Sequence, residues 1–84
     1  MTKEELPNID KEKTGKNICR LMRLHKISMY DLQMTLGFQS PTNIYQWRQG
    51  KYLPSVDNLY KLAYIFGCKM EDFIVKEEKG NEQT

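Results

Sequence analysis

The segment SPTNIYQWRQGKYLPSVDNLYKLAYIFG, residues 40–67, contains the pattern that decides the fold. Ser40-Pro41 places a capping hydroxyl before a proline, a pair that favours the first turn of a helix. Gly50 and Gly67 each follow a run with helical spacing, at the point where a left-handed C-cap favours glycine. The segment therefore predicts two short helices, joined by an extended link at Leu53-Pro54.

Apolar residues recur at helical spacing within both of these helices. The first helix has the apolar pair Ile44 and Trp47. The second begins after a capping Ser55. Its apolar stripe consists of Val56, Leu59, Leu62, Ala63 and Phe66. Each apolar set lies on one side of its helix, so both helices are expected to pack on a shared core.

Two further helices are expected before this segment and one after it. Thr14 is the candidate N-cap of a helix over residues 15–26. The apolar side of that helix consists of Ile18, Leu21, Met22 and His25. Ser28 and Asp31 form a Ser-x-x-Asp capping pattern at the start of the next helix, which Gly37 ends. A short last helix is expected around residues 70–74.

The class predicted from these signals is all-α. No segment alternates with period two over a strand length between turn signals. Helices of two to three turns are unstable alone, so the five must share one core in a compact domain.

The chain is 84 residues long, which is one domain at most. We expect a flexible lead-in over 1–13, a folded domain over 14–75 and a polar tail over 76–84. No apolar run approaches the length of a membrane span, and the charged N-terminus does not resemble a signal peptide. The expected location is therefore the cytoplasm, without a membrane partner.

Charge is uneven along the chain. Residues 14–75 contain eight Lys and Arg against four acidic residues, a net charge of +4. Mild basicity permits a nucleic-acid partner without requiring one. Cys19, His25 and Cys68 lack zinc-ligand spacing, although a disulfide between the two cysteines stays open. No catalytic set, phosphate-binding loop, cofactor motif or small-molecule site is evident, so an enzyme is the least favoured reading.

The helix after Pro41 has an unusual polar side. With Thr42 at 0° and about 100° per residue, Tyr45, Gln46 and Gln49 fall within about 60° of it. Ile44 and Trp47 fall on the opposite side. Helix faces in contact with water are usually rich in Lys and Glu, whereas neutral amides and hydroxyls suit the reading of base edges. An ordinary polar surface is the alternative for this stripe.

The arrangement of short helix, glycine turn and second short helix is that of a helix-turn-helix, whose second helix enters the major groove. Lys51 and Tyr52 follow that helix, where they could contact phosphates. The exposed backbone N–H groups at the starts of the helices after Ser28 and Ser55 are further candidate phosphate contacts.

A longer pattern combines these signals. It reads Gly15-x-x-Ile18-x-x-Leu21, Ile27-Ser28-x-x-Asp31-Leu32-x-x-x-Leu36-Gly37 and Ile44-x-x-Trp47-x-x-Gly50-Lys51-x-x-Pro54-Ser55-x-x-x-Leu59-x-x-Leu62-Ala63-x-x-Phe66-Gly67. The pattern resembles the Xre family of lambda-repressor-like (Cro/repressor type) helix-turn-helix regulators. The resemblance implies a five-helix domain that binds duplex DNA, usually as a homodimer on an inverted-repeat site.

The resemblance also implies which residues contact DNA. The recognition-helix positions it matches are Thr42, Asn43, Tyr45 and Gln46. Positions that often contact the backbone or flanking bases are Gln49, Lys51 and Tyr52. Ser40 is a further candidate, at the start of the recognition helix.

Several positions depart from the family pattern. The turn from Gly37 to Ile44 is one residue longer than usual, which affects Gln39, Ser40 and Thr42 as contacts. Gln33 stands where a small residue is favoured. Met29 replaces a glutamine that often contacts a phosphate. Met22 and Arg48 stand where the family often has an Arg–Glu ion pair, which leaves Arg48 free to face the DNA flank or solvent.

The leading hypothesis is a small, sequence-specific transcriptional regulator of the repressor type. The final apolar segment, Met70 to Val75, is a candidate dimer surface or a cap on the core. The second hypothesis is a protein-binding module of the same fold, antitoxin-like or a regulator subunit, with weak or no DNA binding. Tyr30, Tyr60 and Tyr64 are candidates for its interaction surface.

Overall fold

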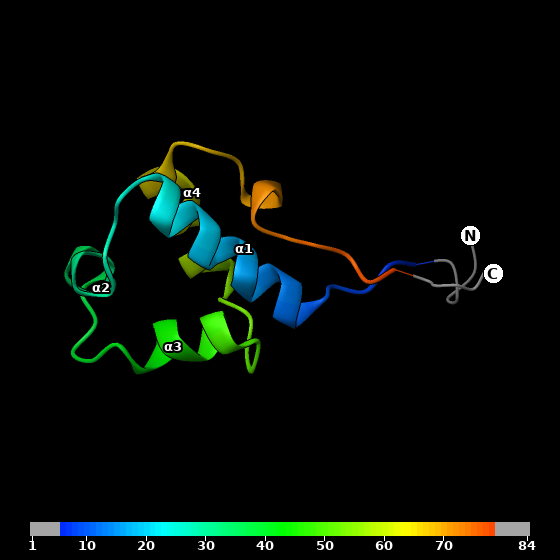
Figure 1. Ribbon diagram of the computed structural model, residues 1–84, viewed down its shortest axis with the longest axis horizontal. Helices are drawn as coiled ribbons and strands as arrows, with labels where there is room; N and C mark the ends of the chain where they lie inside the picture. Colours follow the sequence, from blue (N-terminus) through cyan, green and yellow to red (C-terminus); the bar gives the residue numbers. More distant parts are fainter. Residues whose placement is uncertain (1–5, 79–84) are drawn as a thin grey trace.

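The computed structural model describes residues 6–78 of the chain and consists of four α-helices and one turn of 3-10 helix (Figure 1). Their bounds, in chain order, are α1 Lys11–Leu24, α2 Met29–Leu36, α3 Thr42–Gln49, α4 Val56–Phe66 and the 3-10 helix Met70–Asp72. The all-α prediction is confirmed, but the expected five helices are four plus a single turn.

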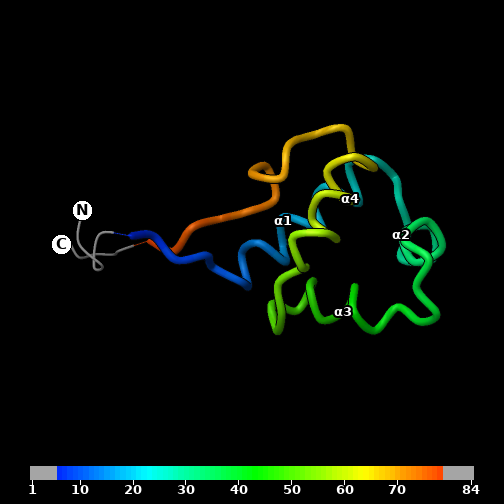
Figure 2. The backbone as a smooth tube through the Cα atoms, turned by 180° about the vertical axis from the view of Figure 1, so that it is seen from behind, coloured from blue at the N-terminus to red at the C-terminus, as the bar shows by residue number. Residues whose placement is uncertain are grey.

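The core is formed by one side of every helix. Ile18, Leu32, Ile44, Leu62 and Phe73 have no solvent-exposed surface. Leu21, Met22, Trp47, Leu59, Ala63 and Phe66 complete the buried cluster. Figure 2 shows the opposite side of the molecule, with α4 in front of α1 and α3 at the lower edge. This packing leaves the side of α3 that faces away from α1 open to solvent.

The first helix begins earlier than predicted. Asp10 is its N-cap, and Asp10 Oδ1 accepts a hydrogen bond from the Lys13 backbone N–H at 2.9 Å. Thr14, the expected cap, lies inside the helix with 1% of its surface exposed. Its hydroxyl accepts a hydrogen bond from the Val75 backbone N–H at 3.0 Å. Thr14 therefore ties the C-terminal segment to α1 rather than starting the helix.

The last helix is a single turn, and the carbonyl groups at its C-terminal end have partners on α1. Asn17 Nδ2 donates hydrogen bonds to the carbonyl oxygens of Asp72 at 2.7 Å and Phe73 at 3.1 Å. Those oxygens therefore point toward α1 instead of accepting bonds from a further turn of helix. Phe73 is fully buried and lies against Phe66, with ring centroids 5.6 Å apart. This segment thus closes the core at one end.

The two ends of the described chain run side by side. Ile9 and Lys76 form an antiparallel β-bridge, and the Asp10 N–H donates to the Val75 carbonyl at 2.7 Å. Part of each expected end segment therefore has structure. Residues 8–13 of the lead-in and residues 76–77 of the tail are either helical or hydrogen-bonded to a partner. Residues 1–5 and 79–84 lie outside the described residues. The division into lead-in, domain and tail stays a prediction.

Among residues 6–78, no helix combines the length and the apolar character that crossing a bilayer requires.

Candidate nucleic-acid interface

The orientation of α3 follows its two apolar residues. Ile44 is fully buried and Trp47 is 4% exposed, so both face the core. The residues on the opposite side are in contact with solvent. Thr42, Asn43, Tyr45 and Gln49 are exposed, and Gln46 is half-buried. The structure therefore brings Thr42, Tyr45, Gln46 and Gln49 onto one open face, and Asn43 is exposed beside it, nearer to Trp47 around the helix.

Close packing against α1 fixes the position of α3. Gly15 lies where the two helices cross, and a Cβ there would lie 2.8 Å from the Arg48 carbonyl oxygen and closer still to that of Trp47. At the end of α3, Gly50 adopts a φ of 79° and lies against the backbone of Glu12. Two glycines thus allow α1 to serve as a rigid support for the exposed face of α3.

The longer turn between α2 and α3 has its own supports. The Phe38 N–H donates to the Gln33 carbonyl at 3.0 Å, and Gln33 Nε2 donates back to the Phe38 carbonyl at 3.3 Å. The Phe38 ring packs edge-on against the Trp47 indole, with centroids 5.9 Å apart. Gln33, which departs from the family pattern, therefore stabilises the turn that carries the extra residue.

The start of α3 differs from the prediction. Pro41 occupies the N-cap position instead of the first helical position, and no side chain caps the helix. Ser40 Oγ instead donates to Thr42 Oγ1 at 3.1 Å and accepts a longer bond from the Thr42 N–H at 3.4 Å. The two hydroxyls form a pair at the exposed start of α3, close to the face that carries Asn43.

Lys51 and Tyr52 lie at the other end of α3. Both backbone N–H groups donate to the Gln46 carbonyl, at 3.0 and 3.4 Å, which folds this segment against the helix. Lys51 Nζ lies 5.7 Å from the centroid of the Tyr52 ring, and both side chains are exposed. A cation and a phenol are therefore available beside the C-terminal end of the open face.

A basic hollow of about 320 Å³ lies between α1, α3 and the start of α2. Its lining includes Arg23, Lys26 and Arg48, together with Ser28 and Met29 at the N-terminus of α2. Arg48 Nε donates to Cys19 Sγ at 2.9 Å, so the guanidinium is held at the edge of α3. The sequence pattern indicated Arg48, but it did not single out Arg23 or Lys26. Arg23 and Lys26 join this hollow only through the packing of α1 beside α3 and the start of α2, which no sequence spacing indicated.

Other chemistry has little support in the described part of the chain. No group of three metal-ligating side chains occurs within residues 6–78. Cys19 and Cys68 are free thiols. Desolvation, followed by the nearby Asp72 carboxylate, raises the pKa of the Cys68 thiol above its ordinary value. His25 lies at the end of α1 against Phe66, with ring centroids 5.3 Å apart, so it is a boundary residue.

Known proteins are similar to this chain in sequence or in fold. Residues 17–79 match the family described as Cro/C1-type HTH DNA-binding domain. The chain is 38% identical over 55 residues to an uncharacterized HTH-type transcriptional regulator of Methanocaldococcus jannaschii, a match covering 66% of this chain and 82% of that protein.

Three solved structures illustrate the likeness of fold. The restriction-modification controller protein C.AhdI from Aeromonas hydrophila superposes with a TM-score of 0.68 at 20% identity, covering 76% of this chain and 96% of that one. The DNA-binding domain of BldD superposes with a TM-score of 0.66 at 13% identity, covering 89% of this chain and 100% of that one. A hypothetical transcription factor, NHTF, from Neisseria superposes with a TM-score of 0.68 at 12% identity, covering 89% of this chain and 85% of that one.

The family match covers most of the described chain and includes α2, α3 and the turn between them. The family is one of DNA-binding proteins and not of enzymes, in agreement with the sequence-based prediction. The curated relative, of whose length the match covers 82%, is named as an HTH-type transcriptional regulator. The chain therefore belongs to the Cro/C1-type helix-turn-helix DNA-binding family.

Proposed function

We propose that this protein binds a specific duplex DNA sequence as a small transcriptional regulator, with α3 in the major groove. The observation that carries the proposal is the open face of α3, on which uncharged hydrogen-bonding side chains lie opposite the buried Trp47. Such side chains can match the donor and acceptor pattern of base edges without a general attraction to phosphate.

The residues at the centre of this face contact the bases. Gln46 suits a bidentate contact with adenine, and Thr42 suits contact with a thymine methyl group. Asn43, Tyr45 and Gln49 lie beside them on the exposed surface. Ser40 orients the Thr42 hydroxyl through their hydrogen bond. Ser40 is therefore a positioning residue in this proposal as well as a candidate contact.

Backbone phosphates are held on both sides of the open face. Lys51 and Tyr52 lie at one end of it. On the other side, Arg23, Lys26 and Arg48 surround the start of α2, where the family often has a glutamine and this chain has Met29. Cations from α1 and α3 thus replace the missing amide. Contacts of this kind set the register on the duplex and make binding depend on salt.

A homodimer on an inverted-repeat site is part of the proposal. One α3 offers a small interface, so two copies related by two-fold symmetry would give useful affinity. The burial of Phe73 favours the segment from Met70 to Val75 as a cap on the core rather than as the dimer surface. Tyr60 and Tyr64 of α4, at 65% and 84% exposed, are the better candidates for contact between copies.

Repression is the regulatory outcome we propose, because occupation of a promoter by a bound protein blocks transcription without further machinery. The decisive experiment is enrichment of random duplexes on the purified protein. We expect one preferred sequence with two-fold symmetry, and a binding constant that falls steeply with salt. The absence of salt-sensitive binding to any duplex would instead favour the protein-binding module, with the exposed tyrosines of α4 as its surface.

A further inference from the structure

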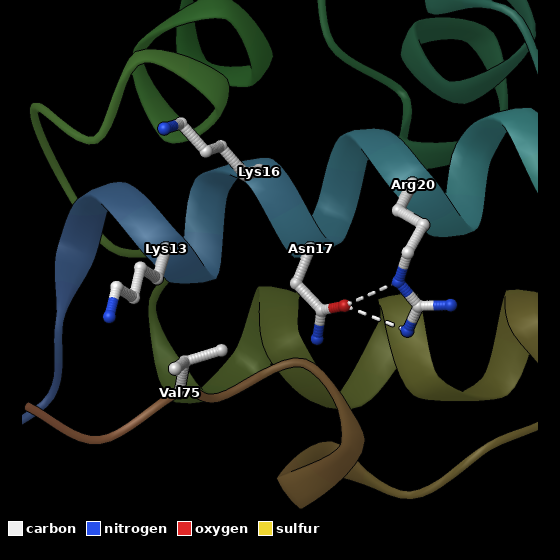
Figure 3. A pocket seen from close by; sticks show the side chains of 5 residues that line it. All are labelled: Lys13, Lys16, Asn17, Arg20 and Val75. Atoms are coloured by element: carbon white, nitrogen blue, oxygen red, sulfur yellow. Dashed lines mark hydrogen bonds between the residues drawn. The ribbon is translucent and has the colours of Figure 1, made fainter.

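A second basic surface lies on α1, on the side that faces away from α3. Measured from Gly15, which contacts α3, Lys13, Arg20 and Leu24 lie about 140° to 180° around the helix at 100° per residue. Lys13, Lys16, Asn17, Arg20 and Val75 line a hollow of about 340 Å³ between α1 and the C-terminal segment (Figure 3). The proposed readout of DNA by α3 makes no use of this hollow.

The guanidinium of Arg20 is held in place without being neutralised. Asn17 Oδ1 accepts hydrogen bonds from Arg20 Nε at 3.0 Å and from Nη2 at 2.8 Å. The Asn17 amide nitrogen is itself anchored to the carbonyl oxygens of Asp72 and Phe73. A neutral amide therefore orients the arginine, and within residues 6–78 its Nη1 group and second Nη2 hydrogen donate to no protein acceptor.

Within the described residues this charge is not paired at ion-pair distance, although the carboxylate of Asp10, the N-cap of α1, accepts a hydrogen bond from the Lys13 backbone N–H. The ion pair found there joins Lys61 and Asp57 on α4, and neither Lys13 nor Arg20 takes part in one. Figure 3 shows the Lys13 and Arg20 side chains directed toward the segment that holds Val75, whereas Lys16 extends over the other edge of α1. The hollow thus has two cations facing it and a third at its rim.

Apolar surface accompanies these cations. Leu24, one turn beyond Arg20 on the same side of α1, is 66% exposed, and Val75 forms the opposite wall of the hollow. A phosphate backbone offers nothing that would cover a leucine. An amphipathic protein segment offers both carboxylates and apolar side chains, so the mixed character of this surface favours a protein partner over a second duplex.

We infer that the outer side of α1, at Lys13, Arg20 and Leu24, is a docking surface for an acidic amphipathic helix of a protein partner. Lys13 and Arg20 are seven residues apart, about 10 Å along the helix axis. Carboxylates two turns apart on a partner helix match that separation. The fixed fork of Arg20 donates two hydrogen bonds to one carboxylate, Lys13 donates to the other, and Leu24 packs against the apolar side chains of the partner.

The test uses a synthetic helical peptide of Ala, Glu and Leu, in which Glu recurs at positions i and i+7 and Leu lies between them. Binding to the full chain is followed by fluorescence anisotropy and by NMR, with the side-chain amide signals of Asn17 as the local reporter. The double change Lys13→Ala with Arg20→Ala is expected to weaken binding about tenfold. The charge-matched control, Lys61→Ala with Lys69→Ala, is expected to leave it within about twofold.

A third variant separates docking from general charge attraction. Arg20→Lys keeps the charge but removes the planar fork, so peptide affinity is expected to fall about threefold. Equal losses for the two double variants, or no effect of Arg20→Lys, would overturn the inference. The inference would also be overturned if a peptide with Gln in place of Glu bound as tightly as the acidic peptide.

A parallel measurement of DNA binding distinguishes this inference from the proposed function. Binding of the selected duplex by the Lys13→Ala, Arg20→Ala variant is expected to match that of the unaltered chain, with the same salt slope. A lowered slope would assign the surface to phosphate contacts and refute the protein partner. Failure of α3 to read DNA would show in the unaltered chain and would leave the peptide result standing.

Discussion

Gly15 of α1 lies against the carbonyl oxygen of Trp47 in α3, with no room between them for a side chain. The contact is between backbones, so neither partner can move aside as a flexible side chain would. It sets the distance between the supporting helix and the helix proposed to read DNA. Both the stability of the domain and the position of α3 therefore depend on a residue that touches no ligand.

Replacement of Gly15 by alanine tests this crossing. Helix propensity alone would stabilise the variant by about 1 kcal/mol. The added Cβ would meet backbone atoms of Trp47 and Arg48, and overpacking of this kind costs about 1 to 3 kcal/mol or more. We expect net destabilisation of up to about 2 kcal/mol, measured by urea unfolding. Gly37→Ala is the control, since its Cβ would enter open space and only its φ of 76° is unfavourable. If the Gly15→Ala variant unfolds with the same free energy as the unaltered protein, the described contact between Gly15 and α3 is contradicted.

The hydroxyl of Thr14 is expected to contribute more than its size suggests. Thr14→Val preserves the shape but leaves the Val75 N–H without its partner, at a cost of about 1 to 3 kcal/mol. Hydrogen exchange at the Val75 amide should become faster in this variant. Thr14→Ser retains the hydroxyl and is expected to keep that amide protected. Slow exchange in the valine variant would mean that Val75 has another partner.

Gln46→Ala is expected to relax sequence preference at one or two base pairs of the selected site. Its backbone carbonyl, which accepts from Lys51 and Tyr52, is unaffected by the change. Folding stability should therefore stay within about 0.5 kcal/mol of the unaltered protein. The measurement is repeated duplex enrichment with the variant. Thr35→Ala on α2, an exposed polar position outside the α3 face, should leave the preference intact. Unchanged preference in the Gln46 variant would argue against this docking of α3.

Removal of a phosphate contact should act on all sequences alike. Lys51→Ala and Arg48→Ala are each expected to lower affinity for specific and unrelated duplexes, and to reduce the salt slope by about one. Lys61→Ala removes the same charge from α4, where Lys61 pairs with Asp57 at 3.1 Å, and should leave the slope unchanged. An Arg48 variant with an unaltered slope would exclude the basic hollow beside α2 from the interface, whereas the role of Lys51 would be judged separately.

Cys68 gives a prediction that depends on pH. Desolvation and Asp72 raise the pKa of its thiol, so in the folded chain it loses its proton at higher pH than in the unfolded chain. The unfolded state therefore binds fewer protons between the two pKa values, and the contribution of Cys68 to stability falls as pH rises through that window. Alkylation of Cys68 by iodoacetamide should reach half its maximal rate at a higher pH in buffer than in denaturant. If the alkylation rate depends on pH in the same way in buffer and in denaturant, the raised pKa of Cys68 is refuted.

Local signals in the sequence predicted much of the fold correctly. The capping box of Ser28 and Asp31 is present, Ser55 caps α4, and Gly37, Gly50 and Gly67 each end a helix in the left-handed conformation. These features depend on neighbouring residues only, so spacing is enough to find them. The open face of α3 was predictable for the same reason, because helical periodicity separates it from Ile44 and Trp47.

Two kinds of feature were not predicted: a helix start without an apolar signal, and contacts between residues far apart in the chain. The first turn of α1 is polar and carries no apolar signal, so Thr14 was interpreted as its cap although Asp10 has that role. The end of the single turn at Met70–Asp72 is bound by the amide of Asn17, more than fifty residues away. The oriented guanidinium of Arg20 has the same origin. Sequence spacing places these residues on a helix face but does not indicate which carbonyl groups lie opposite.

The pairing of Ile9 with Lys76 has a practical consequence. Because the chain enters and leaves the helical body at one place, a short linker could join residues near these positions without disturbing the core (Figure 1). New termini could then be opened in the turn after Gly67, at the opposite end of α4 from its junction with α3. Such a circular permutant would keep α1 to α4 in their order and would show whether the C-terminal segment can cover the core when it precedes α1 in the chain.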